Sequence, residues 1–316
     1  MSTHRPADSL QSPRFAQPAT FMRLPHHRGA AGLDVAILGI PFDGGVSYRP
    51  GPRFAPRAVR EHSSLIRPYH PVLRVSPFEV LKVADVGDVD VNPMNIEDTF
   101  GRVEAAVGAV LEAAAIPACV GGDHSLSLPI LRAVARRHGP VGMVHFDAHQ
   151  DMWEQYFGNR YFHGTPFRRA VEEGLLDPRR VVQVGIRGPV YAEGDFEFGQ
   201  RHGVRVVRAE DVAERGVPWV REQMQVARGG PVYVSFDVDS LDPAFAPGTG
   251  TPEVGGLTSR EALALVRGLV GLPIVGFDVV EVSPPYDPAH ITALLAANVL
   301  FELVAVIAAG RGGQPR

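Results

Sequence analysis

Short apolar runs alternate with polar, Gly- and Pro-rich segments along most of this chain. The runs have the length of β-strands, and most are continuous rather than alternating, which indicates strands buried on both faces of a sheet. The predicted strands are residues 34–40, 81–86, 116–120, 141–147, 181–186, 204–207, 232–237 and 274–282. The segments between and after them predict helices over residues 104–115, 126–137, 219–227, 260–270 and 291–309.

Strands that alternate with helices predict a three-layer α/β/α fold with a mostly parallel sheet. Residues 1–33 are polar and lack periodicity, so we expect an N-terminal arm followed by a single α/β domain over residues 34–316. Ligands of such sheets bind beyond the carboxyl ends of the strands. Functional residues are therefore expected in the loops that follow the strands.

The composition argues against several classes of protein. The 316 residues carry 31 Lys and Arg against 35 Asp and Glu, and a net charge of −4 gives no basic surface for nucleic acid or an anionic membrane. No apolar run approaches the ~20 residues of a membrane-spanning helix, and the first residues lack the apolar core of a secretory signal. The single cysteine, Cys119, lies in an apolar stretch, which favours burial in a reducing compartment and a cytoplasmic location.

Three predicted strands end in acidic and His-containing sequence. Residues 116–120 run into GGDHS, residues 141–146 into DAHQD, and residues 232–236 into DVDSLD. Side chains at positions i and i+2 of a strand face the same side, so Asp147 with His149, and Asp237 with Asp239, each direct a pair of ligand-type side chains to one edge of the sheet. That many carboxylates would repel one another in a desolvated cleft, and divalent cations remove the conflict.

The number of ligand-type residues predicts two metal ions. One ion takes about four to six donors, and bridging carboxylates serve two ions at once. The predicted sites are His124, Asp147, Asp151 and Asp237 for one ion, and Asp147, His149, Asp237 and Asp239 for the other. A set rich in carboxylates favours Mn²⁺, with Ni²⁺, Co²⁺ and Fe²⁺ left open. Asp123, His145 and Asp242 lie beside the ligands and are expected to support them or to form turns.

These segments resemble the metal-binding signatures of the ureohydrolases, the arginase and agmatinase superfamily: GGDHS at 121–125, HFDAHQD at 145–151 and SFDVDSLDPAFAPGTGTPEVGGLTS at 235–259. The resemblance covers essentially residues 34–310, including SYRPGPRFAPRAVR at 47–60 and FDVVEVSPPYD at 277–287. It points to the agmatinase branch, which also includes guanidinobutyrase, guanidinopropionase and proclavaminate amidinohydrolase. The chain departs from the agmatinase pattern at Gln150, where Thr is common, and at Pro52, Ala55 and Trp153.

The resemblance implies roles for further residues and an arginase-like fold. It agrees with the six metal ligands, gives Glu281 the binding of a guanidinium group, and makes His163, in YFHGTPFRRA, a proton shuttle. Asp151 is expected to donate a proton to the leaving amine, which is a poor leaving group otherwise. Two divalent ions that share a water lower its pKa towards neutrality. The resemblance also implies a trimer or hexamer of identical subunits.

The main prediction is therefore an agmatinase that converts agmatine to putrescine and urea, a step of polyamine biosynthesis. The alternative is a hydrolase of a guanidino acid of the guanidinobutyrase, guanidinopropionase or proclavaminate amidinohydrolase type, with Arg49 or Arg160 as a partner for the substrate's carboxylate. The loops at 41–60, 152–161 and 188–196 are expected to form the distal pocket. A metallophosphoesterase and a non-catalytic descendant are more distant alternatives, because the chain lacks a GNH[DE] element and retains every predicted ligand.

Overall fold

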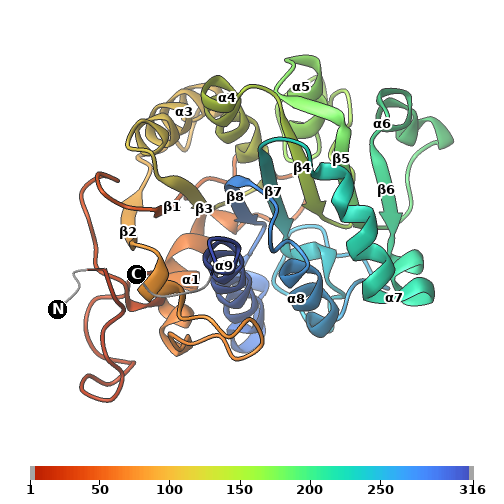
Figure 1. Cartoon of the computed structure of the whole chain (residues 1–316). Helices are drawn as coiled ribbons and strands as arrows, with labels where there is room; N and C mark the ends of the chain where they lie inside the picture. The colour runs from red at the N-terminus through yellow and green to blue at the C-terminus, as the bar shows by residue number, and fades with distance from the viewer. Residues whose placement is uncertain (1–3, 313–316) are drawn as a thin grey trace.

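The computed structural model describes residues 4–312, and within them a single sheet of eight parallel strands is flanked by helices on both faces (Figure 1). The strand order across the sheet is β2-β1-β3-β8-β7-β4-β5-β6. The strands are β1 Val35–Gly39, β2 Val83–Asp88, β3 Ile116–Val120, β4 Val141–Phe146, β5 Leu176–Ile186, β6 Arg205–Arg208, β7 Val232–Asp237 and β8 Ile274–Val280. The predicted three-layer fold and all eight predicted strands are confirmed.

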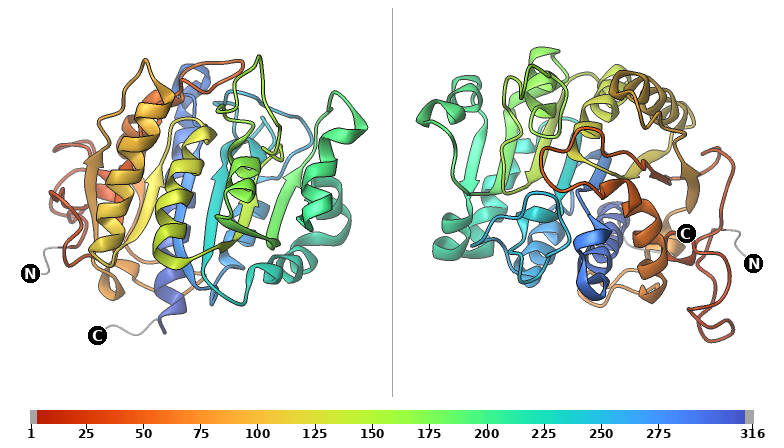
Figure 2. Two further views of the ribbon diagram at one scale, coloured as in Figure 1. Left: turned by 90° about the horizontal axis from the view of Figure 1, so that it is seen from above. Right: turned by 180° about the vertical axis from the view of Figure 1, so that it is seen from behind.

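The helices form one layer on each face of the sheet. Helices α3, α4 and α5 pack together on one face, while α1, α9, α8 and α7 form a continuous row on the other (Figures 1 and 2). The α-helices are α1 Ala55–His62, α2 Pro77–Val80, α3 Ile96–Glu112, α4 Ser127–His138, α5 Pro166–Glu172, α6 Glu197–His202, α7 Ala209–Met224, α8 Ser259–Arg267 and α9 Ile291–Gly310. Both faces of the central strands are thereby covered, as their continuous apolar sequence requires.

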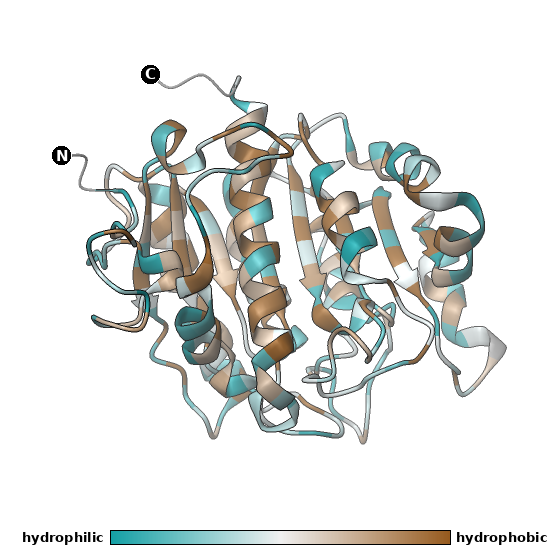
Figure 3. Cartoon of the chain, turned by 90° about the horizontal axis from the view of Figure 1, so that it is seen from below, coloured by the Kyte–Doolittle hydropathy of each residue, from teal (hydrophilic) through white to brown (hydrophobic). Residues whose placement is uncertain are grey.

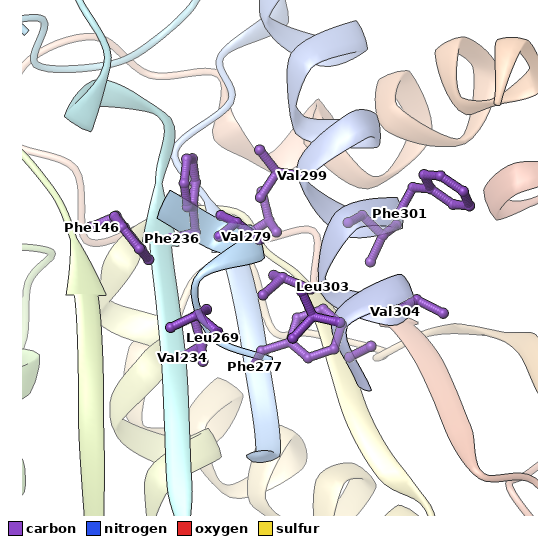
Figure 4. Close-up of a cluster of buried hydrophobic side chains, with 14 of the residues drawn as sticks. Phe146, Val234, Phe236, Leu269, Phe277, Val279, Val299, Phe301, Leu303 and Val304 are labelled. Atoms are coloured by element: carbon purple, nitrogen blue, oxygen red, sulfur yellow. The ribbon is translucent and has the colours of Figure 1, made fainter. Parts of the chain in front are cut away.

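The larger hydrophobic core lies between the sheet and α9. Phe146, Phe236 and Phe277 extend from three neighbouring strands towards Val299 and Leu303 of α9, and all five side chains are buried (Figure 4). Figure 3 shows the same relationship as apolar strands beneath a largely apolar helix. Burial of side chains of this size contributes about 1.5–3 kcal/mol each, so this core holds the central strands in register below the functional loops.

Helix α9 corrects the expectation that no apolar run approaches the length of a membrane span. The segment Pro288–Gly310 is long enough to cross a bilayer, and its most apolar 18-residue window has a mean hydropathy of 2.3. In the structure, however, 83% of its most apolar window is buried against the rest of the chain. The sequence pattern of α9 is therefore that of a core helix of an α/β sheet.

Two predicted helices have different bounds in the structure. Helix α3 begins at Ile96, eight residues before the predicted start, because Asn95 caps it by accepting the backbone N–H of Asp98. Helix α7 lies over Ala209–Met224 rather than 219–227, and Gly216 interrupts it with a φ of 74°. The interruption hides the helical period of the first half from a sequence pattern.

The N-terminal segment packs on the edge of the sheet over part of its length. Phe21, Met22 and Leu24 are buried in the core, and the backbone N–H of Phe21 donates to Asp85 at 3.0 Å. Arg60 stacks on the Phe21 ring with its guanidinium carbon 4.2 Å from the ring centre. The division into an arm and a domain stays a prediction, and residues 1–3 and 313–316 of it lie outside the described chain.

The topology brings the predicted site residues together. Because all eight strands are parallel, their carboxyl ends lie at one edge, and β3, β8, β7 and β4 are neighbours there. These are the strands that lead into the GGDH, VSPP, DVDS and DAHQD segments. Residues far apart in the sequence thus meet above the centre of the sheet, at the place where parallel sheets bind ligands.

Candidate metal centre and active site

Three carboxylates surround one nitrogen of His124. The Nδ1 atom lies 2.9 Å from an oxygen of Asp151, 3.1 Å from one of Asp147 and 3.2 Å from one of Asp237. The four side chains come from the loops after β3, β4 and β7, and each is at most 8% exposed. We refer to them as the His124 cluster, and they are the four residues predicted for the first ion.

The hydrogen bonds behind His124 turn a lone pair towards these carboxylates. Ser235 donates its only hydroxyl hydrogen to Asp278 at 2.7 Å, so its oxygen accepts from Nε2 of His124 at 2.8 Å. The hydrogen of a neutral His124 is therefore on Nε2, and Nδ1 has no hydrogen-bond partner in the described chain. A lone pair and three carboxylates around one buried point form a donor set that fits a divalent cation.

A second group of ligand-type atoms shares Asp147. His149 Nδ1 lies 3.1 Å from Asp239 Oδ2 and 3.4 Å from Asp147 Oδ1, and these three residues form the His149 cluster. Backbone N–H groups orient the carboxylates, since Asp239 Oδ1 accepts from Ala148 at 3.0 Å and Asp237 Oδ1 accepts from Asp239 at 2.8 Å. Asp147 therefore faces both clusters, whereas Asp237 meets the ring of His124 on one side and only the backbone N–H of Asp239 on the other.

The electrostatics of the two clusters are those of a site that needs added positive charge. Burial and the neighbouring carboxylates raise the pKa of Asp237 and Asp239. Burial by itself would lower the pKa of His124 and His149, and the adjacent aspartates instead raise the pKa of both well above the ordinary value. Burial likewise works against ionisation of Asp147, yet the surrounding histidines hold its pKa well below the usual range.

Glu281 lies at the end of β8 with one oxygen free. Its Oε1 accepts the backbone N–H of His124 at 2.8 Å and lies 3.0 Å from Nδ1 of His163, while Oε2 is buried without a partner. Its backbone φ of 66° is in the left-handed region, as is that of Asp151 at 52°. Non-glycine residues in this region are strained, and such strain concentrates at functional sites.

His163 connects Glu281 to the loop that follows β1. The other ring nitrogen, Nε2, lies 2.6 Å from the hydroxyl of Ser47 and accepts the Ser47 backbone N–H at 3.1 Å. Asp123 holds this loop by accepting the backbone N–H of Gly45 at 2.7 Å, and burial together with the Glu281 charge raises the pKa of Asp123 to about 6. Asp123 therefore supports the site, as expected, and Ser47 is a site residue that the sequence pattern did not identify.

A pocket of about 390 Å³ opens above the two clusters. Its outer wall is largely aromatic: Trp153, Tyr156, Tyr191 and Phe196 come from two of the three loops predicted to form it, and Phe162 lies one residue beyond the first of these two loops. The third predicted loop, 41–60, contributes Ser47. Thr251 and Glu253 also line the pocket, from a loop that the sequence analysis did not include. The enclosed volume suits a small molecule whose reacting end reaches the metal ligands.

The residues that line the pocket contradict the prediction that Arg49 or Arg160 meets a substrate carboxylate. Neither Arg49 nor Arg160 lines it, since Arg160 pairs with Glu172 at the surface and Arg49 lies over the rings of Tyr48 and Tyr286. The arginine that does line the pocket, Arg187, is 6% exposed and donates to six backbone carbonyls. Loop lengths alone did not reveal which arginine would point inward.

Comparison with known proteins identifies the family. Residues 33–305 match the Arginase family. The chain belongs to this family. It is 53% identical to "Guanidinopropionase" of Pseudomonas aeruginosa over 306 residues, which cover 96% of each protein, and 50% identical to "Agmatinase, mitochondrial" of Gallus gallus, over 91% of this chain and 85% of the relative. The solved structure of proclavaminate amidino hydrolase from Streptomyces clavuligerus superposes with a TM-score of 0.91 at 46% identity, over 95% of this chain and 100% of the other.

These relatives decide between the predictions made from the sequence. The ureohydrolase resemblance, the arginase-like fold and the enzyme class, an amidinohydrolase of guanidino compounds, are confirmed for this arginase-family chain. A metal-binding cluster of His and Asp side chains is present as well. Relatives named for guanidino acids are prominent, and they favour the guanidino-acid alternative over the main prediction of an agmatinase.

Proposed function

We propose that this arginase-family chain hydrolyses a short guanidino acid, of the size of 3-guanidinopropionate or 4-guanidinobutyrate, to urea and the matching amino acid. The observation that carries the proposal is the 53% identity to guanidinopropionase over 96% of both chains. The buried donor set agrees with hydrolysis of a guanidino group.

We further propose that two Mn²⁺ ions bind at the His124 and His149 clusters, and that the subunits form a homo-oligomer. The ligands would be His124, Asp151 and Asp237 at one site, His149 and Asp239 at the other, with Asp147 shared. Carboxylate oxygens outnumber imidazole nitrogens in this set, which favours Mn²⁺ among divalent ions of the first transition row. When bound, such a pair of ions supplies hydroxide at neutral pH by lowering the pKa of water.

Glu281 would bind and orient the substrate's guanidinium group. Its free Oε2 is buried, negatively charged and without a hydrogen-bond donor, so a guanidinium N–H supplies the partner that the protein does not. The Oε1 atom, held by His124 and His163, fixes the plane of the carboxylate. A guanidinium held in this way keeps its central carbon at a constant position above the His124 cluster.

Asp151 and His163 would handle the protons of the reaction. The leaving nitrogen departs as a neutral amine only if it gains a proton, and Asp151, which lines the pocket, would take that proton from the attacking water and pass it to the amine. His163 would exchange protons with solvent, since its Nδ1 faces Glu281 and its Nε2 faces Ser47. The Ser47 backbone N–H suits the neutral ring, and the hydroxyl also accepts from a protonated ring.

A second candidate substrate, agmatine, is favoured by the charges of the pocket wall. The arginine in that wall, Arg187, has its N–H groups occupied by carbonyls, whereas Asp195 and Glu253 both line the pocket. An aromatic wall with carboxylates suits an ammonium group. The neutral donors of Trp153, Tyr156 and Ser47 would have to bind the carboxylate of a guanidino acid instead.

Kinetics on four substrates test the proposal. Urea release is measured from 3-guanidinopropionate, 4-guanidinobutyrate, agmatine and arginine with Mn²⁺-loaded protein, and the Glu281→Gln variant serves as the low-activity control. We expect the highest kcat/KM for one of the two guanidino acids. A tenfold higher kcat/KM for agmatine, a preference of about 1.4 kcal/mol in transition-state binding, would refute the guanidino-acid proposal.

A further inference from the structure

Two fully buried polar side chains lie behind the DAHQD loop and take no part in the proposed chemistry. His145 is on β4 and Gln183 is on β5, and the register of these parallel strands pairs the two residues directly. Neither side chain is reached by solvent. Burying an imidazole and a carboxamide is costly unless their hydrogen bonds serve the structure, so their contacts indicate what they do.

Two hydrogen bonds connect this pair to the loop, and a third joins its two members. The Nε2 amide of Gln183 donates to the carbonyl of Gln150 at 2.7 Å and lies 3.0 Å from Nδ1 of His145. The other ring nitrogen of His145, Nε2, lies 2.8 Å from Oδ2 of Asp147. Gln183 therefore contacts Gln150 of the loop directly, and it acts on Asp147, the first residue of the loop, through the imidazole of His145.

The contact with Gln150 determines where the hydrogen atoms lie on both Gln183 and His145. A carbonyl oxygen only accepts, so Gln183 must present its NH₂ group, rather than its oxygen, on this side. The second hydrogen of that group points at His145, whose Nδ1 must then be the acceptor. The ring hydrogen of a neutral His145 is consequently on Nε2, where it is donated to Asp147.

We propose that Gln183 is a positioning residue for the metal centre, because it makes His145 a hydrogen-bond donor to Asp147 rather than a metal ligand and holds the 147–151 loop at Gln150. The inference rests on the proposed metal ligands. It resolves an ambiguity, since the ligand-type atoms of His124, His145, Asp147 and Asp151 lie within 4.8 Å of one another. A nitrogen that bears a hydrogen offers no lone pair to a cation.

The hydrogen bonds from Gln183 to His145 and from His145 to Asp147 fix the orientation of the shared carboxylate. Asp147 Oδ2 accepts from His145 and faces His124 at 3.1 Å, while Oδ1 accepts the backbone N–H of His149 and faces the ring of that residue at 3.4 Å. Each oxygen thus has one fixed donor and one open direction. Phe167 closes the back of the site, with its ring centre 4.4 Å from that of His145.

Metal binding provides the first test. Gln183→Leu removes the donor, and Gln183→Glu keeps the size but replaces the NH₂ by an acceptor. We expect both variants to bind Mn²⁺ about 10–100-fold more weakly at one site or both, the usual cost of losing such a partner of a ligand. Calorimetric titration of the metal-free protein measures this, and Gln200→Glu on the exposed face of α6 is the matched control. Wild-type affinity in a folded Gln183→Leu variant would overturn the proposal.

The second test reads the position of the His145 hydrogen in the native chain, and variants serve only to assign the signal and to provide a contrast. ¹⁵N NMR of histidine-labelled, metal-free protein distinguishes the two neutral forms of the ring, and His145→Phe identifies the signal. We expect hydrogen on Nε2 and a bare Nδ1, a pattern that persists when a diamagnetic divalent cation is added and is lost in Gln183→Glu. Loss of the Nε2 hydrogen on metal addition would show that His145 is a ligand. Neither test uses a guanidino substrate, so failure of the proposed activity leaves both readouts intact.

Discussion

The imidazole of His163 meets the carboxylate of Glu281 at 3.0 Å, and both groups are almost completely buried. Burial would lower the pKa of His163, but the charge of Glu281 and its hydrogen bond raise it above the ordinary value. The group proposed to bind the guanidinium therefore also sets the protonation of the residue proposed to exchange protons. A substrate that neutralises Glu281 changes His163 at the same moment.

The Glu281→Gln variant tests whether the charge of Glu281 sets the pKa of His163. Without the carboxylate charge of Glu281, burial is opposed only by the charges of Asp151 and Asp123, so the pKa of His163 falls, which an NMR titration of the metal-free protein measures. We also expect kcat/KM to fall by about 10²–10³, as for loss of one essential polar contact in an active site. An unchanged pKa of His163 in this variant would contradict the coupling.

The same pair gives a pH dependence of stability with a defined sign. The pKa of His163 is higher in the folded chain than the ordinary histidine value of 6.5, so the pair stabilises the fold fully below about pH 6.5. This contribution is lost as the pH rises through the folded value. Denaturant titrations of the metal-free protein from about pH 5.5 to about pH 9 cover the range in which a histidine titrates. They should show a smaller pH dependence of the free energy of unfolding in Glu281→Gln than in the wild type.

Asp147→Asn tests the shared carboxylate. Asp147 faces both clusters, so we expect loss of at least one bound metal ion per subunit and of nearly all urea release. Metal content after dialysis, measured by mass spectrometry, reports on this independently of activity. Asp90→Asn, at an exposed position, is the control and should retain full metal content. Two tightly bound ions in Asp147→Asn would remove the basis for a bridging role.

Gly122→Ala tests the close packing beneath the GGDH segment. A Cβ atom at this position would lie 1.6 Å from the carbonyl oxygen of Phe42, so the backbone must move. We expect destabilisation of about 1–3 kcal/mol or more, measured by denaturant unfolding. Gly108→Ala, inside α3 with no neighbour within 4 Å, should instead stabilise by about 0.5–1 kcal/mol. Equal effects at the two positions would contradict the packing argument.

Arg187→Lys tests the support of the loop after β7. The guanidinium donates to carbonyls that include Asp239 at 2.7 Å and Glu253 at 2.6 Å, and an ammonium group cannot reach six acceptors at once. Each buried carbonyl left without a donor costs about 1–3 kcal/mol, so we expect a clear fall in the unfolding temperature and weaker metal binding at the His149 cluster. Arg136→Lys, largely exposed on α4, should change neither quantity.

The strands could be predicted because each is a short apolar run that needs no knowledge of its neighbours. The six ligand-type residues could be predicted because their spacing follows directly from strand ends. Helix α7 was misplaced because Gly216 interrupts it, and the arginines near the pocket were misjudged because side-chain direction depends on tertiary contacts.

The supporting residues illustrate a different limit. Gln183 has no distinguishing pattern in the sequence, and its role depends on the register that pairs it with His145 on β4. Ser47 is similar, because its contact with His163 joins two loops separated by 116 residues. Such relationships require the strand order and register, which local sequence patterns do not contain.

The position of β8 in the sheet has a consequence for the order of folding. Among the described strands, β8 is last in the chain, yet it pairs with β3 on one side and β7 on the other. During synthesis, the β1–β3 half and the β4–β7 half have no strand between them until Ile274–Val280 has left the ribosome. His124 belongs to the first half and Asp147 to the second, so cation binding reports the moment at which the two halves close around their last strand.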